Sequence, residues 1–145
     1  MNHSAFPLKP VPIPLTVNIS EESSDISDLE RVLRSREWDT IADSELRELA
    51  YTFSLLTDEA TRYYLPALIG SRIPEVIESA VQITCPTIGN GREIDCGALF
   101  RLFGPYTSDQ RTSVLQFLQQ YRAGYQEIDQ AINSFWSKPY SVFKS

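Results

Sequence analysis

Residues 55–69 read LLTDEATRYYLPALI, and this stretch decides how the helical part of the chain is organised. Thr57 stands at a helix N-cap position, because its side-chain oxygen can accept a hydrogen bond from a free amide of the first turn. Asp58 and Glu59 follow in that turn, where acidic side chains favour the positive end of the helix dipole. Pro66 lacks an amide donor and disfavours helical backbone before it. The stretch therefore predicts a helix that begins after Thr57 and ends or kinks at Pro66, and most of it requires no active site.

Helical periodicity continues upstream. In DSELRELAYTFSLL, residues 43–56, apolar side chains recur at spacings of three and four, which is typical of an amphipathic helix. The predicted inner stripe is Leu46, Leu49, Ala50 and Phe53, whereas Glu45 and Glu48 point away and Asp43 can cap the helix. SDLE at 27–30 has the form of a capping box and predicts the start of a shorter helix. Prolines alternate with apolar residues over 5–19, which predicts an extended arm with a short edge strand around 15–19.

The downstream half also reads as helical. Pro74 can open a helix that reaches residue 83, and the proline and glycines of CPTIGNGRE indicate a loop after it. Residues 93–103 predict a short helix that exposes Arg92 and Arg101 at its flanks. TSDQ at 107–110 repeats the capping-box form. Apolar residues then keep helical phase through Gly124 to residue 136, which favours one long or gently broken helix.

These elements predict an all-α, or nearly all-α, single domain. We expect an extended arm over 1–20, a helical domain over 21–138 and a C-terminal tail over 139–145. The composition is that of an ordinary globular protein, with 42% hydrophobic and 22% charged residues among 145. The N-terminal stretch does not read as a signal peptide, and no apolar run approaches a membrane span, so we expect a cytoplasmic protein. Cys85 and Cys96 are expected to be reduced and partly buried, with a disulfide as the weaker alternative.

Several chemistries lack the residues that they require. The single histidine, His3, lies in the predicted arm, so a Ser–His–Asp or Cys–His arrangement has no base in the core. Two cysteines eleven residues apart do not make a zinc site, and GNG at 89–91 opens no phosphate-binding loop. Paired carboxylates remain open as catalysts, as Asp58 with Glu59 or Glu93 with Asp95. Asp58 and Glu59 do not converge on one substrate without outside help, and Glu93 and Asp95 flank a loop and form at most a poor cation site. We therefore expect no catalytic residues, no metal site and no cofactor.

Charge is distributed unevenly along the chain. Residues 1–60 hold twelve acidic and five basic side chains, a net charge of −7, and residues 61–145 hold seven and eight, a net charge of +1, which together give −6. An acidic surface repels phosphate backbones and attracts basic surfaces, so nucleic-acid and membrane binding are disfavoured and a basic protein partner is favoured. The alternative is that the acidic residues only solvate helix faces. The candidate binding residues are Asp25, Asp28, Glu30, Glu37, Trp38 and Asp39.

Aromatic residues can serve an interface or a core. Trp38 lies between the acidic segments and would be the natural anchor of an interface if it is exposed, with a core position as the alternative. Tyr51, Tyr63 and Tyr64 are open to the same two interpretations, although adjacent Tyr63 and Tyr64 cannot both be fully buried on one helix.

The motifs together carry a family resemblance. Trp38, the block LTDEATRYYLPALI, the helix start TSDQRTSVLQFL and the late FW resemble a family of small bacterial proteins catalogued as a domain of unknown function. The likeness covers roughly residues 30–137 and implies a stable single domain without carrying over any catalytic residue. The matching positions are Trp38, Leu56, Thr57, Glu59, Ala60, Arg62, Tyr63, Leu65, Pro66 and Ala67.

Two functional hypotheses follow from the sequence. The first is a small protein-binding protein, such as an immunity protein that neutralises a toxin through the acidic segment between Glu21 and Glu48. The alternative is an enzyme that uses carboxylates together with Arg62 and Tyr63. The sequence favours the first hypothesis because the residue sets of the common enzyme classes are absent. It does not indicate an oligomeric state.

Overall fold

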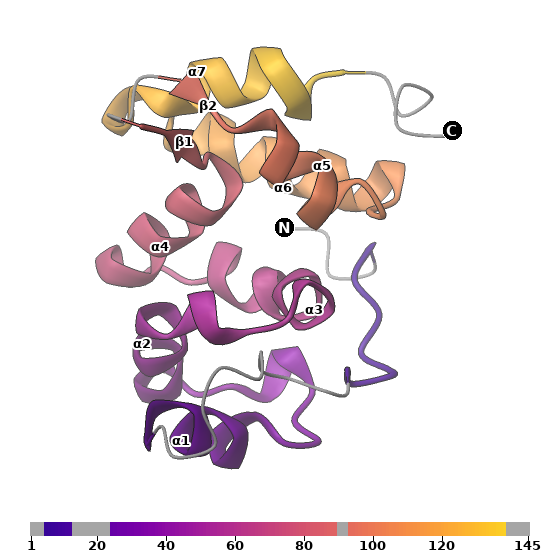
Figure 1. Cartoon of the computed structure of the whole chain (residues 1–145), viewed down its shortest axis with the longest axis vertical. Helices are drawn as coiled ribbons and strands as arrows, with labels where there is room; N and C mark the ends of the chain where they lie inside the picture. Colours follow the sequence, from indigo (N-terminus) through magenta and orange to yellow (C-terminus); the bar gives the residue numbers. More distant parts are fainter. Residues whose placement is uncertain (1–4, 13–23, 90–92, 139–145) are drawn as a thin grey trace. The chain divides into compact units, whose positions relative to one another are not determined.

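The computed structural model describes residues 5–12, 24–89 and 93–138, with the backbone alone for 24–28. Within these residues the chain forms seven α-helices, three short 3₁₀ turns, one π-helical turn and two strands of two residues each (Figure 1). The all-α prediction is confirmed. None of the helices in the described part is long and apolar enough to cross a membrane. The predicted edge strand at 15–19, Arg92 and the tail over 139–145 lie outside the described residues.

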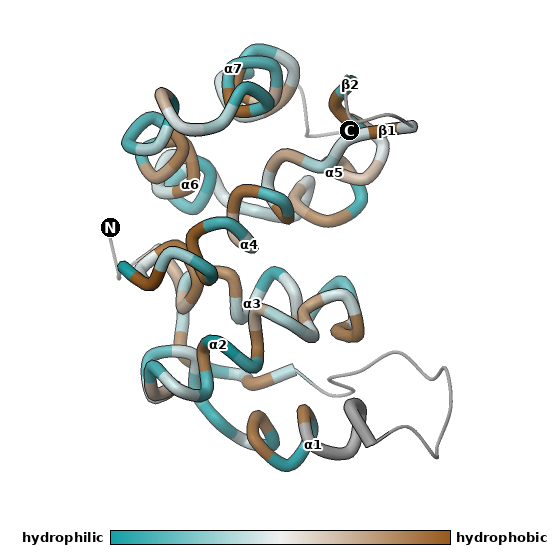
Figure 2. Tube along the Cα trace, turned by 90° about the vertical axis from the view of Figure 1, so that its left-hand side faces the viewer, coloured by the Kyte–Doolittle hydropathy of each residue, from teal (hydrophilic) through white to brown (hydrophobic). Residues whose placement is uncertain are grey.

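The helices pack as two compact units, Phe6–Ser79 and the part of the chain from Ala80 onward, a division that we did not predict within the helical span 21–138. The first unit contains α1 (Ser24–Leu33), η2 (Trp38–Thr40), α2 (Asp43–Tyr51), η3 (Phe53–Leu55) and α3 (Asp58–Ile69). In this unit α3 packs against η2 and α2, and α2 packs against α1. Hydrophobic residues recur along each of these helices between hydrophilic ones (Figure 2). The buried side chains include Leu29, Leu33, Leu46, Leu49, Phe53, Tyr64, Leu65 and Leu68.

Helix α3 begins as predicted but does not end as predicted. The Thr57 side chain accepts a hydrogen bond from the Ala60 amide at 3.2 Å, which confirms the N-cap. The helix then continues through Pro66 to Ile69, so of the two predicted outcomes at Pro66, an end or a kink, the end is wrong. Pro66 and its neighbours are buried against the rest of the unit, and this packing offsets the one backbone hydrogen bond that a proline removes.

Two other helix starts in the first unit differ from the predictions. Helix α1 begins at Ser24, so Ser27 lies inside the helix rather than at its N-cap. At the start of α2 the cap residue is Ala42, and Asp43 is the first helical residue. The Ala42 amide donates instead to the Glu45 carboxylate at 2.9 Å. The Glu45 side chain therefore bonds the start of its own helix, whereas the sequence predicted that it points away.

The second unit contains the C-terminal half of α4 (Pro74–Thr84), a hairpin of β1 (Thr87–Ile88) and β2 (Glu93–Ile94), α5 (Cys96–Phe103), α6 (Ser108–Gln120), η4 (Arg122–Gly124), α7 (Glu127–Ala131) and η5 (Ile132–Trp136). The hairpin is antiparallel, with Thr87 opposite Ile94, and it replaces the predicted loop. Gly89 has a φ of +63° in its turn, a conformation that glycine adopts without strain. The side chains at the centre of this unit include Leu99, Phe103, Val114, Leu118, Ile128 and Phe135.

The prediction of one long or gently broken helix over 111–136 is wrong, because separate elements form with extended backbone between them. The Thr107 capping box with Gln110 is present, but α6 ends at Gln120 and the chain passes through η4 before Tyr125 becomes extended. The turn at Gly124 redirects the chain, and α7 and η5 then continue with their apolar residues facing the same core. The apolar residues therefore keep helical spacing on both sides of the break at residues 121–126, and this spacing alone does not reveal the break.

Candidate functional site

Trp38 is a core residue in this structure. Its side chain is 4% exposed, its Nε1 donates to the Phe6 carbonyl at 3.4 Å, and the Phe6 ring meets it edge-on. These contacts fix residues of the N-terminal arm on η2. The condition under which Trp38 would anchor an interface, namely its exposure, is therefore not met.

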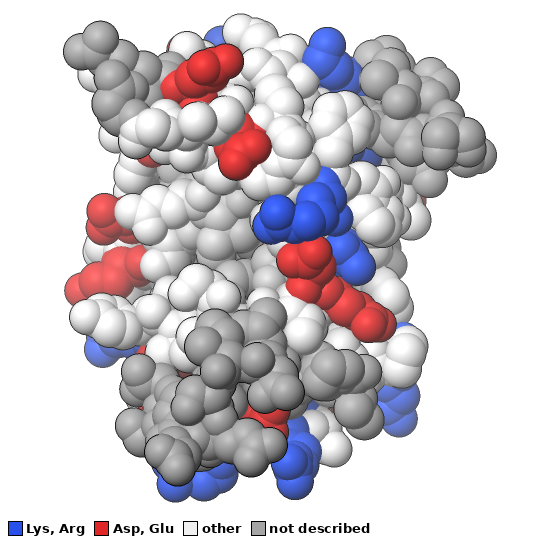
Figure 3. Space-filling model, viewed as in Figure 1, with Lys and Arg blue, Asp and Glu red and all other residues white. Residues whose placement is uncertain are grey.

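The acidic candidates are only partly brought together. Glu30 forms an ion pair with Arg34 at 3.4 Å, Glu37 is half-buried, and Asp39 is exposed in η2. The side chains of Asp25 and Asp28 lie outside the described residues. On the face drawn in Figure 3, acidic and basic side chains form small separate groups rather than one acidic field.

Arg36 and Glu45 form a polar network that stabilises the first unit. The two Arg36 guanidinium nitrogens donate to the two Glu45 carboxylate oxygens at 3.1 and 3.0 Å, and one of them also reaches the Thr40 carbonyl. The hydrogen bond from Arg36, followed by that from the Ala42 amide, lowers the pKa of Glu45 below its ordinary value. A carboxylate held by these partners is a structural group rather than a proton donor or acceptor at neutral pH.

The tyrosine pair in α3 also connects elements of the fold. Tyr64 is fully buried, and its hydroxyl lies 2.8 Å from the Arg36 carbonyl and 3.0 Å from the Leu33 carbonyl. Tyr63 is half-buried, and its hydroxyl donates to the Leu8 carbonyl and accepts from the Trp38 amide. Burial is the main cause that raises the pKa of both hydroxyls. The geometry therefore does not favour Tyr63 as a catalytic group.

Buried Arg111 is a structural residue of the second unit. Its Nη2 donates to the Phe135 carbonyl at 2.8 Å, and its guanidinium lies over the rings of Phe135 and Trp136 at 4.6 and 5.6 Å. The Trp136 Nε1 in turn donates to the Thr84 carbonyl. A cation stacked on two aromatic rings and bonded to backbone ties α6 to η5.

The other candidate carboxylates lie at helix starts and in a strand. The Asp95 carboxylate accepts from the Ala98 amide at 3.1 Å and caps α5, while Glu93 is exposed in β2. Asp58 and Glu59 lie in the first turn of α3, as predicted. Within the described residues, no group of three or more His, Cys, Asp or Glu side chains is arranged to hold a metal ion.

Of the candidate aromatic residues Trp38, Tyr51, Tyr63 and Tyr64, Tyr51 is the exposed one. Its side chain is 91% exposed at the last residue of α2, with exposed Glu48 one turn earlier. Ser79 of α4 donates to the Ala50 carbonyl at 3.4 Å, so the end of α2 lies beside the α4 turn that carries exposed Glu75 and Glu78. We call Glu48, Tyr51, Glu75 and Glu78 the Tyr51 surface. The sequence signal for it was available, because Tyr51 is out of phase with the Leu46–Leu49–Phe53 stripe.

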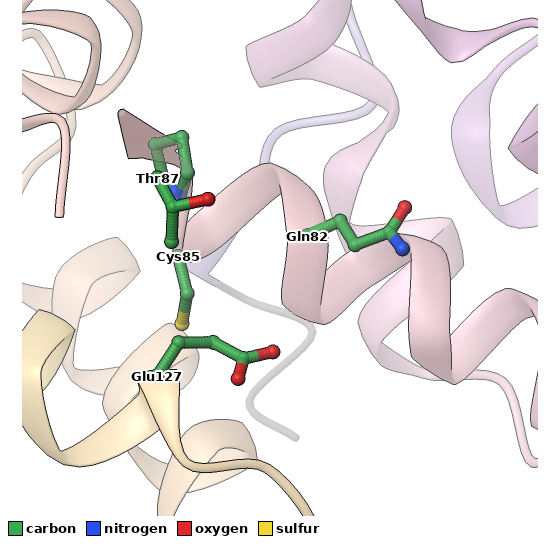
Figure 4. A pocket seen from close by; sticks show the side chains of 5 residues that line it. Gln82, Cys85, Thr87 and Glu127 are labelled. Atoms are coloured by element: carbon green, nitrogen blue, oxygen red, sulfur yellow. The ribbon is translucent and has the colours of Figure 1, made fainter. Parts of the chain in front are cut away.

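A polar pocket of about 250 Å³ lies in the second unit. Gln82 of α4, Cys85 and Pro86 just after that helix, Thr87 of β1 and Glu127 of α7 line it (Figure 4). The Cys85 thiol is directed toward the side on which the Glu127 carboxylate lies. Burial, more than the nearby Glu127 charge, raises the pKa of Cys85 to about 12, so the thiol stays protonated at neutral pH. Sequence reasoning missed this pocket because its residues come from two segments forty positions apart.

The comparison with protein families identifies the chain. Residues 17–140 match the profile of DUF6714, a family of unknown function. The chain belongs to this family. The match spans the arm's end, both helical units and the whole of the LTDEATRYYLPALI block. Comparisons with curated proteins and with solved structures give no match.

Proposed function

We propose that the protein binds a basic protein partner, and that the Tyr51 surface is the centre of the contact. The observation that carries the proposal is a tyrosine 91% exposed among three exposed acidic residues. Tyrosine contributes a large, rigid contact area and is enriched among the residues that dominate binding energy. Tyr51 takes the anchoring role that the sequence had suggested for Trp38.

Charge supports a basic partner. The first sixty residues carry a net charge of −7, exposed Glu48 lies one turn before Tyr51 in α2, and exposed Glu75 and Glu78 lie on the α4 turn that Ser79 joins to the end of α2. Complementary charge accelerates encounter, and an arginine or lysine of the partner can stack on the tyrosine ring. Toxins that cut nucleic acid are often basic, so the proposal extends to an immunity protein that neutralises such a toxin.

The test uses a partner retained from the host's extract at low salt, then purified and measured by surface plasmon resonance. Tyr51→Ala should weaken binding by about tenfold or more, the loss typical of a central aromatic residue. Tyr51→Phe keeps the ring and is the matched control, which should remain within about twofold of the original affinity.

Charge variants test the second half of the proposal. Glu48→Gln and the triple reversal of Asp25, Asp28 and Glu30 to lysine should slow association and flatten its dependence on salt. Glu93→Gln removes an exposed charge from the other unit and should change neither. Binding that is unaffected by Tyr51→Ala and by the charge variants at low salt would show that these residues only solvate the surface.

A further inference from the structure

The pocket beside Cys85 is built from two parts of one unit. Gln82, Cys85, Pro86 and Thr87 follow one another from the last turns of α4 into β1, and Glu127 opens α7. Helix α7 packs against β2, the partner strand of β1, so the two walls of the pocket are held by the same core. The site therefore does not depend on how the two units are placed.

The pocket contains more hydrogen-bonding capacity than the fold uses. Within the described residues, the Glu127 carboxylate, the Gln82 amide and the Thr87 hydroxyl make no side-chain hydrogen bond or ion pair. Glu127 is half-buried, and among the described residues that line the pocket it is the only charged one. A half-buried carboxylate that pairs with no cation of the described residues favours a ligand that brings positive charge.

The remaining lining limits what that ligand can be. Gln82 and Thr87 each offer an oxygen that accepts a hydrogen bond, and Pro86 offers an apolar ring. A guanidinium or primary ammonium group carries several N–H donors and no acceptor, which fits one carboxylate and two neutral oxygens. Burial raises the pKa of Cys85, so the thiol stays protonated at neutral pH and is a poor nucleophile.

We infer that this pocket binds a small organic cation through its guanidinium or ammonium group, with Glu127 as the counter-ion and Gln82 and Thr87 as neutral acceptors. The inference is independent of the proposed protein-binding function. Its site lies in the second unit, whereas the Tyr51 surface lies in the first. An experiment that refutes one of the two proposals leaves the other unaffected.

The experiment is a titration of the full chain, labelled with ¹⁵N, followed by NMR at constant ionic strength. The probes are methylguanidinium and propylammonium, with N-methylurea as the neutral control. Either cation should produce saturable shifts at the amides of residues 82–87 and 127–128, and N-methylurea should produce none. Constant ionic strength is required because salt screens exposed charges.

Two variants separate a specific site from general attraction by an acidic protein. Glu127→Gln preserves the size of the side chain and should weaken cation binding by about tenfold, equal to about 1.4 kcal/mol. Glu93→Gln removes an exposed charge on the neighbouring strand and should change the affinity by less than about twofold. Circular dichroism of both variants checks that the fold is kept, which is expected because Glu93 is exposed and Glu127 is half-buried.

The inference is overturned if neither cation gives saturable shifts, if N-methylurea binds as well as the cations, or if the two variants weaken binding equally. Should Glu127→Gln fail to fold, Glu127→Asp provides the second variant. It keeps the charge but withdraws it from the pocket, and it should weaken methylguanidinium binding while Glu93→Asp does not.

Discussion

Replacing Tyr64 by phenylalanine tests the centre of the first unit. The substitution removes one oxygen atom from a fully buried side chain and leaves the ring and its edge-to-face contact with Tyr63 in place. The hydroxyl lies within hydrogen-bond distance of the Leu33 and Arg36 carbonyls, at the junction between α1 and η2. It has one proton, so it donates to one of them at a time.

The cost can be worked out from what each carbonyl retains. The Leu33 carbonyl still accepts from the Arg36 amide at 2.9 Å, so it keeps a partner after the substitution. The Arg36 carbonyl loses the hydroxyl at 2.8 Å, in a residue that is half-buried. One lost hydrogen bond and one partly desolvated acceptor together correspond to about 1–2 kcal/mol of unfolding free energy.

Urea unfolding followed by circular dichroism and tryptophan fluorescence measures this cost. With a urea slope of about 2 kcal/mol per molar, the middle of the usual range, the midpoint should fall by about 0.5–1 M with an unchanged slope. Tyr63→Phe is the matched control, because its hydroxyl is half-buried and water can replace its partners, so it should cost no more than about 0.5 kcal/mol. The reasoning is refuted if the two variants are equally stable, or if Tyr64→Phe is as stable as the unaltered protein.

Three further predictions concern caps, charge and thiols. Thr57→Ala should lower the unfolding free energy by about 1 kcal/mol, measured by urea unfolding, and leave partner binding intact; a loss of binding at unchanged stability would contradict the structural role. Glu45→Gln should destabilise the protein at neutral pH, and because the folded state lowers the pKa of Glu45, this difference should fade as the pH falls from the unfolded pKa through the folded one. A double-mutant cycle with Arg36→Ala over a pH series measures it, and a coupling independent of pH would count against the ion pair. In mass-spectrometric alkylation of the native protein, Cys96 should react before buried Cys85, and the difference should vanish in urea; equal native rates would show that Cys85 is accessible.

The sequence predicted those features whose partners are close along the chain. Thr57 and Thr107 each bond an amide three residues later, so their caps can be recognised from a few letters. The end of α3 could not be read in the same way, because the packing that carries the helix past Pro66 comes from elements distant in sequence. Local propensity disfavoured the continuation of α3 through Pro66, and burial of this part of the helix in the folded unit stabilised it.

Burial and long-range assembly account for the other differences. A tryptophan in an acidic segment fits a core as well as an interface, and only the packing of Phe6 on η2 decides the position of Trp38. Helical phase did place Tyr51 outside the apolar stripe, but phase does not reveal which helix lies next to it. The pocket could not be predicted because Glu127 reaches Cys85 only after the chain has turned at Gly124.

The π-helical turn η5 has a consequence for how related chains are aligned. Its Ser137 amide donates to the Ile132 carbonyl at 2.9 Å, five residues back, so the turn holds one residue more than an α-helical turn. If a relative that lacks this residue is aligned without a gap, each following residue is matched to one that lies about 100° away around the helix axis. Its alignment therefore needs a one-residue gap between 131 and 137, and the arginine at 111 and the tryptophan at 136 should be lost or kept together.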